Sequence, residues 1–222
     1  MIKAILFDMD GTILDTLTDI WIAVNHAFNI KGFREQSLDK VRQSVGNGAM
    51  TLIKRVVPNH LSDEEIKEVF DIYQHYYDQH HTKHTGPYPG VMSLLYTLKD
   101  RGYKLGVVSN KFEHLVEALN HDIFNGIFDI SIGETKGVPI KPAPDMLYRA
   151  LDILKVAKNE VVFVGDSDTD IITAQNADIL SVGVTWGFRD KDVLIDHGAK
   201  YIINNPSELI SLLEKGFHDE LN

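Results

Sequence analysis

Short runs of apolar residues that end at small or acidic residues constrain the fold of this chain most strongly. Apolar runs of four or five residues without polar alternation are typical of strands buried on both faces, as in parallel sheets. Helical patterns lie between most of the runs, which favours crossover connections. The sequence therefore predicts an α/β fold with a doubly wound, Rossmann-like parallel sheet. The strongest predicted strands cover residues 4–7, 105–108 and 161–164, and weaker ones cover residues 128–132, 181–185 and 201–203.

A long helical segment separates the first two strong strands, which lie about a hundred residues apart. One crossover between parallel strands does not need that length. Apolar side chains at Ile20, Val24 and Phe28 have helical spacing. Ser62 and Glu65 match a capping box, which predicts the start of another helix. We therefore expect an all-α helical cap with a small core of its own.

Turn-forming residues at positions 86–90, Gly-Pro-Tyr-Pro-Gly, predict the second linker of this helical segment. The first linker must then lie near Asp15 and Thr16. These positions divide the chain into an α/β core of residues 1–15 and 85–222 and a helical cap of residues 16–84. Two adjacent linkers can act as a hinge, so the cap can serve as a lid.

The composition limits the partners of the chain. It has 22 Lys and Arg against 32 Asp and Glu, for a net charge of -10. Nucleic acids and anionic membranes are bound by an excess of Lys and Arg, so neither is expected as the main partner. The absence of Cys excludes disulfides, thiolate metal sites and a cysteine nucleophile. The apolar N-terminal run is too short for a signal peptide or a membrane span, so we expect a cytoplasmic protein. We expect the protein to be a monomer or a homodimer.

Charged and polar residues follow the predicted strands. The carboxyl ends of the strands in an open parallel sheet lie along one edge, and ligands bind there. We therefore expect a single site to collect these side chains. They are Asp8 and Asp10 after the first strand, Ser109, Asn110 and Lys111 after the second, Asp166, Asp168 and Asp170 after the third, and Lys141 before a helix.

Crowded carboxylates repel each other unless a cation compensates their charge. The candidate ligands are all oxygen donors, which favours Mg2+ over zinc. A cation beside carboxylates, a lysine, a serine hydroxyl and loop amides is suited to a phosphoryl group, whose charge must be neutralised. The residue types therefore indicate a magnesium-dependent phosphoryl-transfer site.

Asp8 and Asp10 are two residues apart, so on a strand both carboxylates face the same way. One can attack phosphorus as a nucleophile. The other can protonate the leaving oxygen and later accept a proton from water. This pair divides one difficult displacement into two steps through an aspartyl-phosphate.

Four segments resemble the motifs of the haloacid dehalogenase superfamily, in the order in which that family has them. They are residues 8–16 (DMDGTILDT), 107–111 (VVSNK), 141–145 (KPAPD) and 165–170 (GDSDTD). The helical insert between the first two motifs resembles the type 1 cap of this family. The chain is most similar to the phosphoglycolate phosphatase branch, since residues 45–48, 89–91 and 185–189 also match its segments.

The resemblance implies a role for each aspartate. Asp8 is expected to be the nucleophile and a metal ligand. Asp10 is expected to be the general acid and base, and to bind the metal through its backbone carbonyl. Asp166 is expected to bind Mg2+ directly, and Asp170 to lie in the second layer around the ion. The resemblance assigns no role to Asp168, which fits a charge near a helix N-terminus that favours the helix dipole.

The same resemblance implies which residues bind phosphate. The Ser109 hydroxyl and the backbone amide of Asn110 are expected to hold phosphoryl oxygens. Lys141 is expected to neutralise both the nucleophile and the phosphate. Thr12 is grouped with these residues and is expected to orient Asp10 or its loop.

Histidines and tyrosines of the helical segment invite other interpretations. His75, His80, His81 and His84 are close together but lack the Glu of a HExxH helix, so they fit a helix end better than a zinc site. Nearby tyrosines at positions 73, 76 and 77 are expected to pack in the core of the cap.

The segment Gly46-Asn47-Gly48 matches either a simple turn or a loop that lowers onto the substrate, and the second interpretation is favoured. The Arg55 guanidinium can pair with a substrate carboxylate. The alternative, which is more common for arginines, is an ordinary position on the surface.

These observations together predict a Mg2+-dependent phosphatase acting on a small phosphorylated metabolite, with phosphoglycolate first among the substrates because of the resemblance. A β-phosphoglucomutase-like phosphomutase and an inorganic pyrophosphatase share the chemistry up to the aspartyl-phosphate, and analysis of the products separates them. A signalling module phosphorylated on Asp without turnover is a further alternative. Asp10 and the helical insert argue against it, because such modules lack both.

Overall fold

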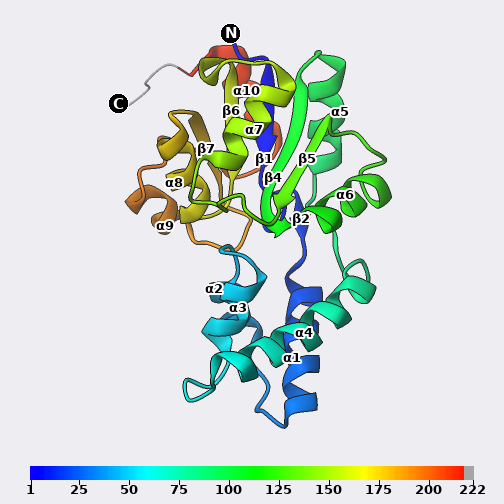
Figure 1. Cartoon of the computed structure of the whole chain (residues 1–222). Helices are drawn as coiled ribbons and strands as arrows, with labels where there is room; N and C mark the ends of the chain where they lie inside the picture. The colour runs from blue at the N-terminus through cyan, green and yellow to red at the C-terminus, as the bar shows by residue number, and fades with distance from the viewer. Residues whose placement is uncertain (218–222) are drawn as a thin grey trace.

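The computed structural model describes residues 1–217, and its centre is a six-stranded parallel sheet with the strand order β5-β4-β1-β6-β7-β8 (Figure 1). Each pair of neighbouring strands is parallel. This arrangement confirms the predicted α/β fold. The strands are β1 (Ala4–Phe7), β4 (Lys104–Phe112), β5 (Ile130–Glu134), β6 (Val161–Gly165), β7 (Leu180–Val184) and β8 (Tyr201–Ile203).

Helices cover both faces of the sheet, because alternate residues of each strand point to opposite faces. Ile5 and Phe7 pack with α5, α6 and α10, whereas Ala4 and Leu6 pack with α7 and α8. All four of these strand residues are buried, as the unalternated apolar run predicts. The helices and the 3-10 turn of this part are α5 (Val91–Asp100), α6 (Glu113–Asp122), α7 (Asp145–Leu154), η1 (Lys158–Glu160), α8 (Asp168–Ala177), α9 (Lys191–Asp196) and α10 (Ser207–Lys215).

Strand β4 is longer than the sequence predicted. The apolar run ends at Val108, but the strand continues to Phe112, with a shift in its pairing with β5 between these two residues. Ser109, Asn110 and Lys111 therefore lie on the strand and do not follow it. The apolar pattern could not show the full length of the strand, because its last residues before Phe112 are polar and lie at the site.

A second group of helices lies beyond the carboxyl ends of the strands (Figure 1). It consists of α1 (Leu17–Lys31), α2 (Leu38–Ser44), α3 (Ala49–Val56) and α4 (Asp63–His80). Ser62 and Glu65 form the expected capping box at the start of α4. Tyr73 and Tyr77 are buried in a separate apolar cluster of these helices, which Leu115 and Phe188 also join. This separate cluster supports the division into core and cap, which stays a prediction.

The two linkers between these parts lie side by side. Strand β2 (Leu14–Asp15) pairs antiparallel with β3 (Gly86–Pro87). Next to this pair, the buried carboxylate of Asp19 accepts hydrogen bonds from the backbone N–H groups of His84 and Thr85, each at 2.9 Å, and from the Thr85 hydroxyl at 2.9 Å. The His84 ring Nδ1 lies 2.7 Å from the same carboxylate. Asp19 thus ties the beginning of α1 to the segment that leaves α4.

Among the described residues, no helix has the length and apolar character that crossing a membrane requires.

Candidate active site

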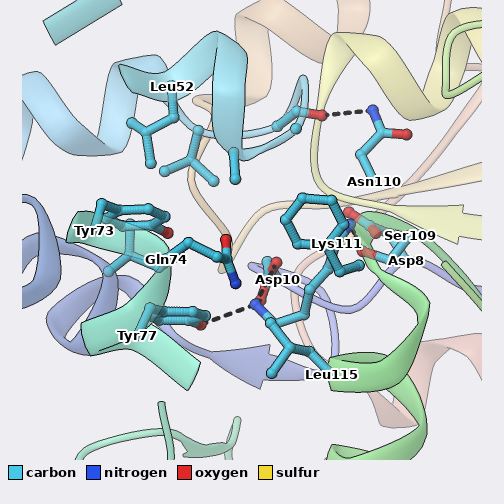
Figure 2. A pocket seen from close by; sticks show the side chains of 16 residues that line it. Asp8, Asp10, Leu52, Tyr73, Gln74, Tyr77, Ser109, Asn110, Lys111 and Leu115 are labelled. Carbon is cyan, nitrogen blue, oxygen red and sulfur yellow. Dashed lines mark hydrogen bonds and ion pairs between the residues drawn. The ribbon is translucent and has the colours of Figure 1, made fainter. Parts of the chain in front are cut away.

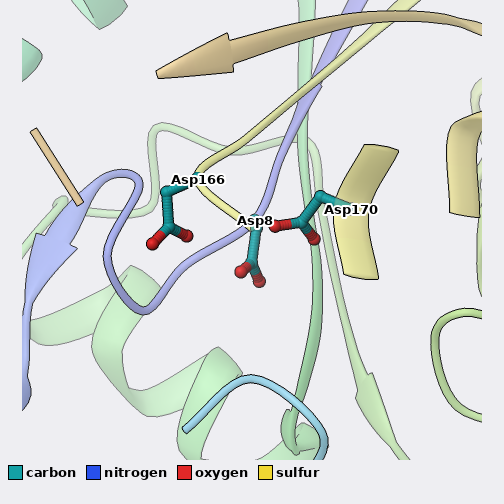
Figure 3. Close-up of side chains that lie close together, drawn as sticks. All are labelled: Asp8, Asp166 and Asp170. Carbon is teal, nitrogen blue, oxygen red and sulfur yellow. The ribbon is translucent and has the colours of Figure 1, made fainter. Parts of the chain in front are cut away.

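Three buried aspartates meet at the carboxyl ends of β1 and β6 (Figure 3). Asp8 follows β1, Asp166 follows β6, and Asp170 lies in the first turn of α8. Because β1 and β6 are neighbours in the sheet, the residues that follow them are brought together. One carboxylate oxygen from each lies within 4.8 Å of the others. The strand order thus produces the cluster that the sequence predicted at this edge.

Lys141 provides a positive charge inside this cluster. Its Nζ lies 2.8 Å from Asp8 Oδ1 and 2.6 Å from Asp170 Oδ1, and the side chain is only 1% exposed. Burial alone lowers the pKa of Lys141, but Asp170 and Asp8 raise that pKa by more, so it ends well above its ordinary value. The lysine is therefore charged at neutral pH.

Asp170 is fully occupied by other protein groups. Its Oδ2 accepts hydrogen bonds from the Ser167 hydroxyl at 2.6 Å and from the Ser167 backbone N–H at 3.1 Å, while Oδ1 pairs with Lys141. Ser167 caps α8 in the same exchange. These contacts hold Lys141 in place and fit the predicted position of Asp170 behind the direct metal ligands.

One lysine does not neutralise three carboxylates. Burial raises the pKa of Asp8 to about 7, even though Lys141 lowers that pKa, and Asp170 adds to the increase. Burial and then Asp170 raise the pKa of Asp166 to about 8. Such shifts mean that the negative charges are poorly compensated by the protein itself. A divalent cation would supply the missing charge, and a set of carboxylate oxygens without sulfur suits a hard cation. The donor set therefore fits a divalent metal.

Asp166 is oriented by three segments of the core. Its Oδ1 accepts a hydrogen bond from the Thr12 hydroxyl at 3.1 Å, and its Oδ2 accepts one from the Phe188 backbone N–H at 2.7 Å. Gly11 and Gly187 pack against this carboxylate so closely that a Cβ at either would lie within 2.5 Å of it. Both glycines are needed for this close approach.

The structure gives Thr12 a different partner from the one the sequence suggested. The hydroxyl donates to Asp166, not to Asp10, and the residue is buried. The Thr12 side chain thus orients Asp166, a candidate metal ligand. Its contacts do not support its grouping with the phosphate-binding residues. The sequence could not identify this partner, because Asp166 is 154 positions away.

Asp10 is not part of the carboxylate cluster but pairs with Lys111 (Figure 2). The Lys111 Nζ lies 3.0 Å and 3.1 Å from the two oxygens of Asp10 and donates to the Tyr77 hydroxyl at 2.8 Å. The sequence analysis placed Lys111 in a motif without a role, and it expected Tyr77 only in the cap core. The position of Lys111 directly after Ser109-Asn110 was the one sequence feature that pointed to it.

A pocket lies between the aspartates and the helices of the cap (Figure 2). Its polar lining comes mainly from Asp8, Asp10, Ser109 and Lys111. Most of the remaining lining is apolar or aromatic. The other lining residues are Ile20, Val45, Gly46, Gly48, Ala49, Leu52, Tyr73, Gln74, Tyr77, Asn110, Phe112 and Leu115.

The structure places Ser109 and Asn110 at the pocket with different contacts. The Ser109 hydroxyl accepts only a long hydrogen bond of 3.3 Å, from the Lys111 backbone N–H. The Asn110 side chain is engaged at both ends: it accepts from the Lys141 N–H at 2.8 Å and donates to the carbonyls of Lys141 and Gly46. Asn110 therefore joins the lysine segment to the cap loop, and only its backbone amide could serve phosphate.

The loop at residues 45–48 lines the pocket on the cap side, and its contact with a substrate stays a prediction. Arg189 donates to the carbonyls of Val45 at 2.6 Å and Arg42 at 3.0 Å. Asn47 donates to the Thr169 hydroxyl at 2.9 Å. These contacts fix the cap loop to the core, and the one to Thr169 reaches the first turn of α8, next to Asp170.

Arg55 lies away from the pocket. It is exposed, its guanidinium donates to the Ser44 carbonyl at 3.1 Å, and it is absent from the pocket lining. The contacts of Arg55 therefore give no support to the idea that it binds a substrate carboxylate. The sequence does not show which group an arginine on an amphipathic helix will contact.

The histidines behave as residues at a helix end. The rings of His80 and His81 lie within hydrogen-bonding distance of the Tyr76 and Tyr77 carbonyls one turn earlier, and His84 meets Asp19. In the part of the chain that the structure describes, the one potential metal-binding group is that of Asp8, Asp166 and Asp170.

Comparisons with known proteins agree with this geometry. Residues 5–184 match the profile of the haloacid dehalogenase-like hydrolases. The chain is 31% identical over 214 residues to a phosphoglycolate phosphatase of Aquifex aeolicus, covering 96% of this chain and 97% of that one. It is 32% identical over 220 residues to the same-named protein of Pasteurella multocida, covering 96% and 98%.

A crystal structure from Lactobacillus delbrueckii subsp. bulgaricus, of a protein provisionally assigned as a phosphoglycolate phosphatase, has the same fold. It superposes with a TM-score of 0.89 at 35% identity and covers 93% of this chain and 96% of that one. The match therefore extends over both the sheet and the helical segment. The chain belongs to the haloacid dehalogenase-like hydrolase family and is an enzyme of its phosphatase branch.

Proposed function

We propose that this enzyme hydrolyses a small organic phosphomonoester, with phosphoglycolate as the leading substrate, through an aspartyl-phosphate on Asp8. The observation that carries the proposal is the position of Asp8. Its carboxylate lies at the pocket, 2.8 Å from the Lys141 ammonium and within reach of two further buried carboxylates. A nucleophile for phosphorus needs this combination of access and charge neutralisation.

Magnesium is the proposed cofactor. The carboxylates of Asp8 and Asp166 and the backbone carbonyl of Asp10 would hold it, with Asp170 and Thr12 behind them. When bound, the ion supplies positive charge to the phosphoryl oxygens and relieves the repulsion among the aspartates. Its charge adds to that of Lys141, which contacts Asp8 and Asp170.

In the first proposed step, an Asp8 oxygen attacks phosphorus while the bond from phosphorus to the alcohol oxygen breaks. Asp10 transfers its proton to that leaving oxygen. Lys141, the Ser109 hydroxyl and the Asn110 backbone amide hold the phosphoryl oxygens. The product alcohol then leaves from the pocket under the cap.

In the second step, Asp10 takes a proton from water, and the water oxygen attacks phosphorus. The bond between phosphorus and Asp8 breaks, so the carboxylate is restored and inorganic phosphate is released. The closed loop at residues 45–48, held by Arg189 and Asn47, limits the access of bulk water to the intermediate.

Phosphoglycolate is favoured as the substrate by two observations. The relatives that match nearly the whole chain carry this substrate in their names. The pocket is also lined by side chains that leave room for a compact leaving group between the cap and Asp10. The partner of the enzyme is thus a small phosphorylated metabolite.

The test is product analysis with purified enzyme, Mg2+ and phosphoglycolate. We expect glycolate and inorganic phosphate in equal amounts, over many turnovers. Asp8→Asn and Asp10→Asn should each abolish turnover, and beryllium fluoride should form its adduct on Asp8. An isomerised phosphate ester without free phosphate would indicate a mutase and contradict the proposal, and turnover by Asp8→Asn at the wild-type rate would exclude the aspartyl-phosphate.

A further inference from the structure

The pocket contains a cation that the two chemical steps do not use directly. Lys111 is the single Lys or Arg among the described residues that line the pocket. Its side chain is only 5% exposed. The neighbouring lining side chains of Phe112, Leu115 and Leu52 are apolar. A buried ammonium in such surroundings interacts strongly with any anion that enters.

Lys111 and Tyr77 together retain donor capacity at the pocket wall. An ammonium has three N–H donors, and the two oxygens of Asp10 can share one of them. The Tyr77 hydroxyl accepts a second at 2.8 Å, which leaves a third N–H for a ligand. Burial raises the pKa of Tyr77 well above its ordinary value, so its hydroxyl keeps a proton that it can donate.

This pair of adjacent donors matches the two acceptor oxygens of a carboxylate. The same ammonium contacts Asp10, the proposed proton donor to the leaving oxygen. An anionic group one carbon beyond that oxygen would therefore come close to Lys111. Elsewhere on the cap side of the pocket, Ile20, Val45 and Leu52 offer no donor. Tyr73 and Gln74 also line this side, but neither is positively charged, and the Gln74 amide already donates to Asp78.

We propose that Lys111 and Tyr77 form a subsite for a carboxylate of the leaving group, so that the enzyme selects phosphomonoesters whose alcohol is an α-hydroxy acid. This inference rests on the proposed phosphatase function and assigns the specificity of that same site. Lys111 comes from strand β4 of the core, and Tyr77 comes from helix α4 of the cap (Figure 2). The subsite is therefore complete only when the cap lies on the core.

The first arm of the test compares two esters with the same number of carbons. The wild-type enzyme should show a kcat/KM at least about 10-fold higher for phosphoglycolate than for ethyl phosphate, because only phosphoglycolate has a carboxylate that can accept from Lys111 and Tyr77. Equal kcat/KM values for the two esters would overturn the inference.

The second arm locates the preference on the two residues. Lys111→Gln should bring the ratio of the two kcat/KM values close to one, even though the loss of its contact to Asp10 slows both reactions. Tyr77→Phe should lower the ratio by a smaller factor while it keeps the ring. Lys67→Gln, on the exposed side of α4, is the matched control and should leave the ratio unchanged. A wild-type ratio in Lys111→Gln would also overturn the inference.

A third arm separates this inference from the phosphatase proposal. Calorimetry on the Asp8→Asn variant with Mg2+ measures binding of phosphoglycolate and ethyl phosphate without turnover. Tighter binding of phosphoglycolate that disappears in Asp8→Asn/Lys111→Gln supports the subsite, even if the wild-type enzyme hydrolyses neither ester. Equal affinities for the two esters contradict the subsite, whatever the outcome of the activity assays.

Discussion

The backbone N–H of Phe188 donates to Asp166 Oδ2 at 2.7 Å, and this hydrogen bond connects the cluster of buried aspartates to the segment that holds the cap. The next residue, Arg189, donates to the cap carbonyls of Val45 and Arg42. On the other side, the Trp186 indole N–H donates to the Thr12 carbonyl at 2.9 Å. Residues 186–189 therefore link the position of Asp166, the loop after β1 and the cap loop over the pocket.

Replacement of Arg189 should weaken substrate binding more than chemistry. Arg189→Gln removes a charged donor from the C-terminal end of α2, where a cation is favoured by the helix dipole. Loss of these two hydrogen bonds, each worth about 1.5 kcal/mol or more, should raise KM roughly 100-fold with a smaller change in kcat. Steady-state kinetics on phosphoglycolate measures this split. Arg101→Gln, whose partner Glu214 lies on the surface, serves as the control.

A KM in Arg189→Lys between those of the wild type and Arg189→Gln would show that a positive charge near the Val45 and Arg42 carbonyls contributes to binding. A KM that stays at the wild-type value in Arg189→Gln would mean that the cap loop keeps its position without this contact.

Lys141 should matter for both stability and catalysis. Lys141→Met leaves Asp8 and Asp170 buried without their cation, and breaking a buried ion pair from one side costs about 3–5 kcal/mol. Urea unfolding of the metal-free protein should show a loss of this size. Lys158→Met, at an exposed position, should change the free energy of unfolding little.

In the folded Lys141→Met variant, kcat/KM should fall at least about 100-fold, because a fixed charge beside the transferred group is lost. An unchanged kcat/KM would remove Lys141 from the active site.

The sequence predicted that the aspartates Asp8, Asp166 and Asp170 would lie together, because the topology of the sheet brings most of them to one edge. Asp8 and Asp166 follow strands that proved to be neighbours, and a doubly wound sheet gathers such residues at one edge. Lys141 was found by its motif and its position before a helix. Local patterns and topology are sufficient for contacts of this kind.

Contacts between the cap and the core could not be predicted in the same way. The pairing of Lys111 with Tyr77 depends on how α4 docks against β4, and the sequence specifies helical periodicity but not docking. The partner of Thr12 and the outward position of Arg55 depend on side-chain directions that no local pattern encodes. The length of β4 was missed because its last residues are polar and serve the site.

Asp19 should make the hinge sensitive to acid. Although burial raises its pKa, hydrogen bonds from His84 and Thr85 lower the pKa by more, so the net shift is below the ordinary value. A carboxyl group whose folded pKa is depressed stabilises the folded state above its unfolded pKa of about 3.9, and this stabilisation is lost as pH falls through the folded pKa.

Asp19→Asn should therefore lower the free energy of unfolding by about 2 kcal/mol at pH 7, the range for hydrogen bonds to a charged group. The difference from wild type should shrink as the pH falls below about 4, where the Asp19 carboxylate becomes protonated. Urea unfolding at pH 7 and at pH 3 tests the prediction, with exposed Asp152→Asn as the control. A difference at pH 3 as large as that at pH 7 would contradict the assigned role of Asp19.

Magnesium should stabilise the folded protein through Asp166. A ligand that binds only the folded state at 100 times its Kd adds about 2.7 kcal/mol to the free energy of unfolding, so the Tm of the chelator-treated wild-type protein should rise when Mg2+ is restored. Asp166→Asn should lose this rise and the Mg2+-dependent activity. Burial, together with Asp170, raises the pKa of Asp166, so its replacement by a neutral side chain should not destabilise the metal-free fold. Asp152→Asn is the control and should respond to Mg2+ like the wild type, because Asp152 is exposed on α7, outside the cluster. If Mg2+ raises the Tm of Asp166→Asn as much as that of the wild type, the ion binds elsewhere.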